Sequence, residues 1–359
     1  MTIVTPEPRL VSLEHAVMRI AQRGADYDRS PRFPHENWSD LQAAGALDLA
    51  PHSAQTLTQQ IALVSRIAAA DASTARILDG HLNGVERLLT ATPGEVPAHE
   101  LERAAGGRLL LGVWGADPQD DEGDPARIVH VPGGSLVLRG VKVFCSGAGG
   151  VQRALVVASD AGGARRLAYV DTTTAIHIDY GWYQASGLRS SESHRVTFTD
   201  ATVLAILGGP DELSRQPYFA RDGVRTVAIW AGLSHAIAAA TLTAIAQGEG
   251  DSHQDAALGR IRVHLRTIDL WLAYAARSLD QPAPHDAPSC SEIALGARVA
   301  VAESSRAISA AATQICGSRA TVTLADLDRA RRDLEIFLLQ HRLERQLEGL
   351  GRRARGAQR

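Results

Sequence analysis

The sequence predicts an α+β chain, mainly α, with a helical N-terminal domain, a middle antiparallel β domain and a C-terminal four-helix bundle. Three observations predict this order. Apolar side chains recur at helical spacing over residues 74–89, short runs rich in Val, Leu and Ile begin near Arg108, and long helical patterns return from Tyr218 onward. These changes of pattern divide the chain into three predicted domains, at 1–104, 105–212 and 213–359.

The first domain contains three predicted helices, at residues 36–47, 57–70 and 74–89. The third is the clearest, because one stripe of its surface carries seven residues at helical spacing: Ile77, Leu78, His81, Leu82, Val85, Leu88 and Leu89. His81 lies on this apolar stripe between Gly80 and Gly84. Glycine has no side chain to block an approach, so we expect these two positions to let a ligand reach His81.

The second domain is predicted from short apolar runs that alternate with Gly, Pro and Asp. Six strands are expected, at residues 108–114, 127–131, 135–145, 154–158, 166–170 and 194–198. The sequence Pro-Gly-Gly at 132–134 is typical of a hairpin turn. The strands follow one another too closely for crossover helices, which excludes a Rossmann domain and favours an antiparallel sheet or a small barrel.

The third domain is predicted to hold four long helices, at residues 218–247, 253–280, 289–315 and 324–350, with an inter-helix loop at 281–288. Its apolar run at 227–246 approaches the length that spans a membrane. Ala, Ser, Thr and His235 dilute this run, and polar residues flank it closely. We therefore interpret it as a buried bundle helix and expect no membrane association.

Composition and missing motifs exclude several function classes. The 37 basic residues are balanced by 40 acidic ones, so no basic surface is expected for nucleic acid or an anionic membrane. Three cysteines without CxxC spacing argue against a disulfide scaffold or a zinc site and favour a cytoplasmic location. The sequence has no GxGxxG after a strand, no P-loop, no HExxH and no GxSxG, which removes the common nucleotide-binding, metalloprotease and serine-hydrolase classes.

Three segments carry a family resemblance. Residues 140–148 read GVKVFCSGA, residues 187–200 read GLRSSESHRVTFTD, and residues 314–333 read QICGSRATVTLADLDRARRD. In this order, within a helix–sheet–helix frame, they resemble the acyl-CoA dehydrogenase superfamily. The resemblance begins at FPHENWSDLQAAGAL (33–47) and reaches the terminal helix. It implies an FAD-dependent oxidoreductase that acts on an acyl thioester such as acyl-CoA, or on a related small molecule.

The resemblance also implies where FAD is held, between the β domain and the C-terminal bundle. Seven residues match cofactor-contacting positions of the family: Val113, Trp114, Phe144, Cys145, Ser146, Gln314 and Gly317. The last two match a glutamine–glycine motif that reaches the FAD diphosphate across a subunit interface, which implies a homodimer or homotetramer. From the residues alone, Phe144 and Cys145 are equally consistent with a strand in a core, and Gly317 with a helix C-cap.

A dehydrogenase of this family needs a carboxylate base to remove the α proton of the thioester. One family position for this glutamate lies eight residues after the aspartate of an arginine–aspartate pair, here Arg332 and Asp333, and corresponds to His341. The other corresponds to Val224, before Arg225. Neither residue is a carboxylate, so the catalytic glutamate is missing.

A monooxygenase branch of the same fold, typified by dibenzothiophene monooxygenase, matches the sequence better at these positions. It has a histidine on the last helix, a histidine on an N-terminal helix and an FCSGA-like strand. The matching residues are His341, His81 and Ser146, which are the candidate catalytic residues. Imidazoles donate hydrogen bonds to a peroxide and shuttle its proton near pH 7, and Ser146 would be a second donor. A lone histidine on an apolar helix face is more often a core residue, which is the alternative for His341.

Three functions therefore stay open. The first is the FAD-dependent oxidoreductase of the superfamily, served by an electron-transfer flavoprotein. The second is a monooxygenase that uses dioxygen and reduced flavin, either FAD or FMN, supplied by a flavin reductase. The third is a catalytically degenerate subunit for binding or assembly. It is motivated by the acidic loop DPQDDEGDP at 117–125, whose carboxylates would be unfavourable near a reduced flavin unless they face solvent, and by missing diphosphate-binding residues around 248–256.

Overall fold

The computed structural model describes residues 12–48, 56–246, 250–280, 289–340 and 343–356. Five helices precede the sheet: α1 (Leu13–Arg29), α2 (His35–Ala43), α3 (Leu57–Ala70), α4 (Ala72–Leu89) and α5 (Ala98–Ala105). The three helices predicted from the sequence correspond to α2, α3 and α4, whereas α1 and α5 were not predicted. Asp71 separates α3 from α4: its N–H donates to the Ile67 carbonyl, and its carboxylate caps α4 at Thr74 N, 2.8 Å away.

Seven strands form the middle layer: β1 (Leu111–Trp114), β2 (Arg127–His130), β3 (Leu136–Cys145), β4 (Arg153–Ser159), β5 (Arg165–Asp171), β6 (Ile176–Asp179) and β7 (His194–Leu207). Neighbours β2–β3, β3–β7, β7–β5 and β5–β4 are antiparallel, as predicted. A parallel contact between Arg127 of β2 and Ser159 of β4 closes the sheet on itself. β1 also runs parallel to β4, which was not predicted; the β2–β3 hairpin supplies the long connection that parallel neighbours require.

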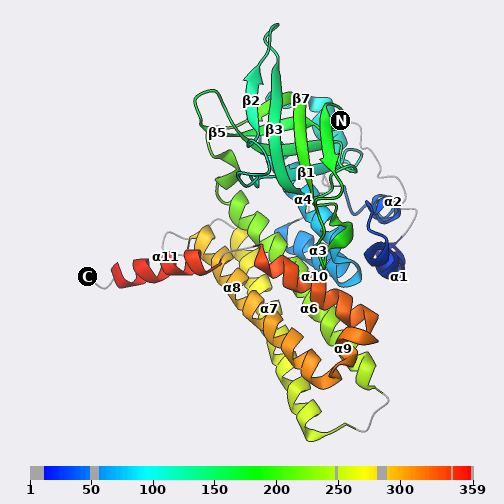
Figure 1. Cartoon of the computed structure of the whole chain (residues 1–359). Coiled ribbons are helices and arrows are strands. Elements are labelled where there is room, and N and C mark those ends of the chain that lie inside the picture. Colours follow the sequence, from blue (N-terminus) through cyan, green and yellow to red (C-terminus); the bar gives the residue numbers. More distant parts are fainter. Residues whose placement is uncertain (1–11, 49–55, 247–249, 281–288, 341–342, 357–359) are drawn as a thin grey trace, which may run out of the picture.

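The C-terminal bundle is built from α6 (Tyr218–Ile245), α7 (Ser252–Asp280), α8 (Cys290–Cys316) and α10 (Ala325–Leu339), with the short α9 (Arg319–Val322) at its end. Figure 1 shows the bundle extending away from the sheet, with α3 and α4 between the two layers. The prediction of one last helix over 324–350 is wrong. α10 ends at Leu339, and a separate α11 (Leu343–Gly356) points away from the bundle (Figure 1). Only Leu343 of α11 is buried, and Leu350 packs against the core in part, so most of this helix lies outside the bundle.

Helix α6 is the centre of the bundle and packs against α3, α4, α7, α8 and α10. It is the one helix in the described ranges that is long and apolar enough to cross a membrane, with a mean hydropathy of 1.5 over its most apolar window. More than half of that window is buried within the protein, and every residue from Val224 to Ser234 is buried. The prediction of a core helix at this position is therefore confirmed.

A fully buried guanidinium joins α6 to α3 and α4. Arg225 donates to the side-chain oxygens of Gln60 at 2.8 Å, Asn83 at 2.5 Å, and Glu86 and Asp222 at 2.7 Å each. Burial opposes the charge, but the two carboxylates outweigh it and raise the pKa of Arg225. The cluster thus offsets the cost of burying charge by pairing it. Glu86 also pairs with Arg221, and Asp222 also pairs with Arg87, so losing Arg225 would remove one of two cations from each carboxylate.

A second buried carboxylate fastens α10 to the loop that precedes β7. Asp333 accepts a hydrogen bond from Leu188 N at 2.6 Å, and burial raises the pKa of this carboxyl to about 7. Gly187 lies so close to α10 that an added Cβ would come within 2.4 Å of the Arg332 carbonyl carbon. Arg332 itself pairs with Asp28 of α1 at 2.7 Å. Arg332 and Asp333 therefore connect α10 to α1 and to the loop before β7, and they do not form a surface ion pair with each other.

We expect Arg225→Leu to lower the free energy of unfolding by about 3–5 kcal/mol, because Glu86 and Asp222 would each lose one of their two cations, and Gln60 and Asn83 would lose a buried donor. The matched control is Arg66→Leu, which removes an exposed pair with Glu14 and should cost less than about 1 kcal/mol. Urea unfolding of both variants measures the difference. Equal losses would contradict the central role of the buried cluster.

The pKa of Asp333 predicts a pH-dependent stability difference. A raised native pKa means that stability is full below 3.8 and falls as the pH rises toward about 7. Asp333→Asn keeps an acceptor for Leu188 N but cannot ionise, so its gain over the natural chain should grow from pH 5 to pH 8, toward roughly 2–4 kcal/mol. Urea unfolding at several pH values measures this gain. A constant difference, equal to that of Asp326→Asn on the exposed face of α10, would refute it.

Candidate functional site

The end of β3 makes a strained turn that places an aromatic ring in solvent. Phe144 has a φ of +52°, although it is a bulky residue, and its side chain is 48% exposed. A break in the β3–β7 register between Lys142 and Cys145 accompanies this conformation. Left-handed backbone at such a residue costs about 1–3 kcal/mol and is found mostly at functional sites. The turn at residues 144–148 is therefore the first candidate for a site.

A second strained loop faces this turn. Leu188 and Glu192 have φ values of +51° and +47°. The two loops are joined by main-chain hydrogen bonds from Gly147 N to Ser191 O at 2.8 Å and from Ala148 N to Glu192 O at 3.1 Å. Since Leu188 is held by the buried Asp333, the position of the turn depends on α10 as well as on the sheet.

Aromatic and hydroxyl groups gather where the loops meet. Trp182 lies edge-to-face with Phe144, with ring centroids 4.9 Å apart. The Ser146 hydroxyl is 2.8 Å from the Ser193 hydroxyl, which is 2.8 Å from the Ser191 hydroxyl. Trp114 of β1 donates its indole N–H to the Ser146 carbonyl at 3.0 Å. The site thus combines an exposed phenylalanine, packed on a half-buried tryptophan, with a buried row of hydroxyls.

The acidic loop at 117–125 lies beside this site, and its carboxylates are paired or face solvent. Asp117 accepts from Lys142 Nζ at 2.6 Å, and Glu122 accepts from the Trp182 indole N–H at 2.7 Å. Asp120, Asp121 and Asp124 are exposed. Burial lowers the pKa of Lys142, and its contact with Asp117 opposes this effect. The sequence analysis expected these carboxylates to be unfavourable near a reduced flavin unless they face solvent. Because they are paired or face solvent, they do not oppose a flavin at this site.

The structure brings five of the seven predicted cofactor residues together: Val113, Trp114, Phe144, Cys145 and Ser146. Trp114 and Cys145 are buried and support the turn from behind, and burial raises the pKa of the Cys145 thiol, so this thiol is not a nucleophile. Gln314 and Gly317 are exposed, and α8 ends beside α9 at the end of the bundle far from the sheet (Figure 1). The other five are thus grouped without them.

His81 lies on α4 inside the protein and is fully buried. Its Nδ1 accepts a long hydrogen bond from Leu111 N at 3.4 Å, and its ring lies edge-to-face with Trp38. Burial lowers the pKa of His81 to about 4, so the imidazole is neutral near pH 7. Gly84 allows close packing of α4 on β1, since an added Cβ would lie 2.9 Å from the Leu111 side chain. This glycine serves helix–strand packing, which differs from the expectation that it admits a ligand.

His341 lies outside the described residues, so its distance from His81 and Ser146 stays a prediction. The residues before it agree with the predicted apolar face: Leu334, Phe337 and Leu338 are all buried. Val224, the other family position for a base, is also buried.

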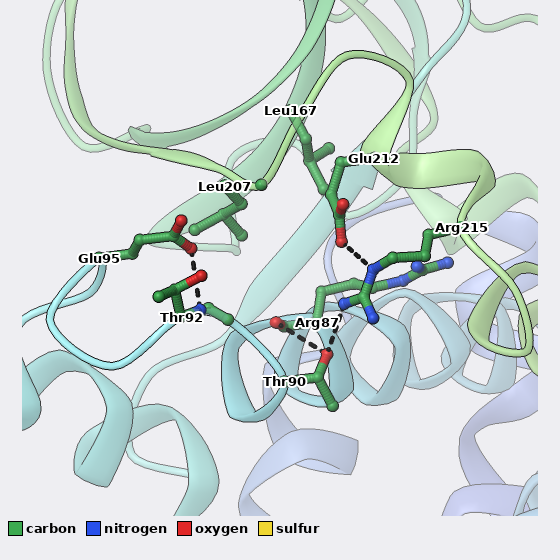
Figure 2. A pocket seen from close by; sticks show the side chains of 10 residues that line it. Arg87, Thr90, Thr92, Glu95, Leu167, Leu207, Glu212 and Arg215 are labelled. Atoms are coloured by element: carbon green, nitrogen blue, oxygen red, sulfur yellow. Dashed lines mark hydrogen bonds and ion pairs between the residues drawn. The ribbon is translucent and has the colours of Figure 1, made fainter.

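Two hollows in the described part of the chain lie elsewhere. The first, about 200 Å³, lies between the end of α4 and strands β5 and β7 (Figure 2). Most of its charges are already paired: Arg215 contacts Glu212 and Thr90, and Arg87 contacts Asp222 at 2.6 Å, while Glu95 accepts a hydrogen bond from Thr92 N. The second, about 230 Å³, lies between α2 and the start of β1 and is lined in part by Trp38, which also contacts His81. Neither hollow is lined by Phe144 or Ser146.

Sequence reasoning assigned no role to four residues of this site: Trp182, Tyr183, Ser191 and Ser193. The available signal was the dense serine run in RSSES, within a segment that the resemblance already used. The partners of these serines come from β3 and from the loop after β6, which no local pattern connects to them.

Comparisons with known proteins place the fold. No model of a known protein family matches the chain, and no curated protein matches its sequence. Among solved structures, the chain is similar to the FMN-bound dibenzothiophene monooxygenase TdsC of Paenibacillus sp. A11-2, with a TM-score of 0.83 and 17% identity over 94% of both chains.

Two further similar structures cover nearly the same length. The methanesulfinate monooxygenase MsuC of Pseudomonas fluorescens has a TM-score of 0.81 and 21% identity over 95% of this chain and 96% of its own. The nitrososynthase of Micromonospora carbonacea var. africana has a TM-score of 0.77 and 22% identity over 93% and 92%. The helical layers, the closed sheet and these likenesses together show that the chain has the acyl-CoA dehydrogenase-like fold that the sequence predicts.

Proposed function

We propose that the protein is a flavin-dependent monooxygenase that uses reduced flavin, FMN or FAD, and dioxygen to oxygenate a small organic molecule. The observation that carries this proposal is the strained turn that holds Phe144 in solvent beside Trp182 and next to the Ser146 hydroxyl. The likeness to two monooxygenases, one of them with FMN bound, supports it. Of the residues that the sequence matched to the monooxygenase branch, Ser146 belongs to this turn.

The residues present fit an isoalloxazine ring, which is flat and apolar on its faces and polar along one edge. Phe144 and Trp182 offer aromatic surface, and Ser146, two residues after Phe144 in the same turn, carries a hydroxyl group. Lys142 pairs with Asp117, so the acidic loop adds less negative charge next to a reduced ring. A tightly packed core would not leave an aromatic side chain half exposed in a strained conformation.

Bound reduced flavin would supply the electrons that activate dioxygen. The chain's own residues would position and shield the ring. In this proposal Phe144 and Trp182 bind it and exclude water from one side, and Ser146 donates a hydrogen bond to its polar edge. His81 is neutral near pH 7, so it would act as a hydrogen-bond partner and not as a cation.

The oxidation of an acyl thioester is the second candidate function. Its only support is that the chain has an acyl-CoA dehydrogenase-like fold. The chain lacks a carboxylate at both family positions for the base, Val224 and His341. The reading as a degenerate subunit loses part of its motivation, because the carboxylates of the acidic loop are paired or exposed. Both remain outcomes of the tests below.

We expect the full chain to bind FMN or FAD, more tightly in the reduced form. Phe144→Ala and Trp182→Ala should each weaken binding about 10-fold through loss of aromatic contact. Phe219→Ala is the control, since Phe219 on α6 is 46% exposed and lies outside the site. Flavin fluorescence titration under anaerobic conditions measures the affinities. The proposal fails if neither flavin binds, or if all three variants bind as the natural chain does.

The missing base gives a second expectation. Under anaerobic conditions, acyl-CoA of any chain length should not bleach bound oxidised flavin, because no carboxylate stands at the family positions for α-proton removal. The reduced complex should react with dioxygen in the absence of acyl-CoA. Absorbance of the bound flavin measures both reactions. Bleaching by one chain length would support the dehydrogenase function instead.

A further inference from the structure

The acidic loop is fastened to the strand that carries Phe144. Near the start of the loop, the Asp117 carboxylate pairs with Lys142 Nζ at 2.6 Å. Near its end, the Asp124 carbonyl accepts a hydrogen bond from Val141 N at 2.8 Å. Lys142 and Val141 belong to β3 and precede Phe144 by two and three positions. The position of the loop is therefore tied to the strand that ends in the strained turn.

One side chain of this loop reaches a different part of the β domain. Glu122 accepts a hydrogen bond from the indole N–H of Trp182 at 2.7 Å, and Trp182 lies in the loop after β6. The other carboxylate oxygen of Glu122 accepts from Gln119 N at 2.8 Å, and the Gln119 carbonyl accepts from Glu122 N at 3.0 Å. The Glu122 carboxylate is thus held by its own turn, so it can fix the indole that it binds.

Two contacts from different segments restrain the Trp182 ring. Its N–H is bound to Glu122, and its ring lies edge-to-face with Phe144, at an interplanar angle of 77°. Because the acidic loop is itself fastened to β3, both contacts refer the indole to the same strand. An aromatic side chain that is already ordered loses less conformational entropy when a ligand binds to it, which raises affinity.

Charge alone predicts the opposite effect for Glu122. The backbone hydrogen bond from Gln119, the indole of Trp182 and the positive charge of Arg195 all lower the pKa of this carboxyl, so it is ionised near pH 7. A negative charge beside an electron-rich reduced flavin is unfavourable, so removing it should strengthen binding if charge were its only effect. The sign of the change in affinity therefore distinguishes a positioning role from a purely electrostatic one.

We propose that Glu122 is a positioning residue that holds the Trp182 indole in the orientation in which it binds the flavin ring together with Phe144. This inference rests on the proposed function, because it needs flavin beside Phe144. Glu122 acts through Trp182 and does not touch the flavin. The acidic loop then favours flavin binding through this one hydrogen bond, although its charge opposes a reduced flavin.

The test is the dissociation constant for reduced FMN, measured by anaerobic titration of the full chain. We expect Glu122→Ala to weaken binding about 3- to 10-fold, because Trp182 would lose its fixed orientation. Glu122→Gln keeps a carbonyl oxygen for the indole N–H and should bind within about 2-fold of the natural chain.

Asp121→Ala is the matched control. Asp121 lies next to Glu122 in the same turn, and its exposed carboxylate makes no hydrogen bond or ion pair within the described residues. The substitution removes one negative charge from the loop without touching Trp182. We expect it to leave binding of reduced FMN unchanged or to strengthen it.

A double-variant cycle assigns the effect to Trp182. Trp182→Phe keeps an aromatic ring but has no N–H to donate, so it should weaken binding about as much as Glu122→Ala. Adding Glu122→Ala to Trp182→Phe should cause no further loss, because both changes remove the same hydrogen bond.

The restraint on Trp182 is also measurable without flavin. The indole N–H resonance of Trp182 in a nitrogen-15 NMR spectrum is assigned by its loss in Trp182→Phe. We expect this resonance to shift in Glu122→Ala and its proton to exchange faster with water, whereas Asp121→Ala should leave both unchanged. Urea unfolding of the two variants checks that the fold is retained.

The outcomes separate the two proposals. Weaker binding by Glu122→Ala, rescue by glutamine and no further loss in the double variant support the positioning role. Equal or tighter binding by Glu122→Ala overturns it while leaving flavin binding intact, and so does an equal loss in Asp121→Ala or Glu122→Gln. An unchanged indole resonance in Glu122→Ala also overturns it. If the natural chain binds neither FMN nor FAD, the proposed function fails, and this inference fails with it.

Discussion

A single buried carboxylate holds the helical bundle against the loop on which the candidate site depends. Asp333 of α10 accepts from Leu188 N, and the next residues of that loop carry Ser191 and Ser193. The charge is costly at this depth, and burial raises the pKa of the carboxyl to about 7. The hydrogen bond nevertheless fixes a left-handed residue that the loop needs to turn back toward β3. Helix, loop and turn therefore form one connected unit.

Left-handed backbone residues and the hydrogen bonds between loops are concentrated in the same region. Phe144, Leu188 and Glu192 all adopt left-handed backbone, and hydrogen bonds between the two loops hold them there. The Arg225 cluster joins α3, α4 and α6, and α4 in turn contacts the loop segment Arg189–Ser191. Leu188 and Glu192 are buried and Phe144 is exposed, so the strained backbone is held from the interior while one aromatic ring faces solvent, as a preformed binding site requires.

The sequence predicted most of the frame because periodic patterns are local. Residues 57–70 and 74–89 form helices, the Pro-Gly-Gly turn joins β2 to β3, and the apolar run in α6 is a core helix. The predictions from sequence failed for features that depend on tertiary contacts. Helix 324–350 is broken, and β1 pairs in parallel with β4, because these outcomes depend on which surfaces find a partner. Phe144, Cys145 and Ser146 were proposed by resemblance, and their grouping with Trp114 follows from the closed sheet.

By itself, the sequence determined the order of layers and the residue types at the strained turn, since both depend on short-range patterns. It also determined that no carboxylate stands at the family positions for a base. Only the tertiary structure decided that His81 is buried and neutral, that Lys142 pairs with the acidic loop, and that the Ser193 hydroxyl lies 2.8 Å from those of Ser146 and Ser191. These properties arise from burial and from contacts between segments far apart in the chain. A local sequence pattern predicts neither of them.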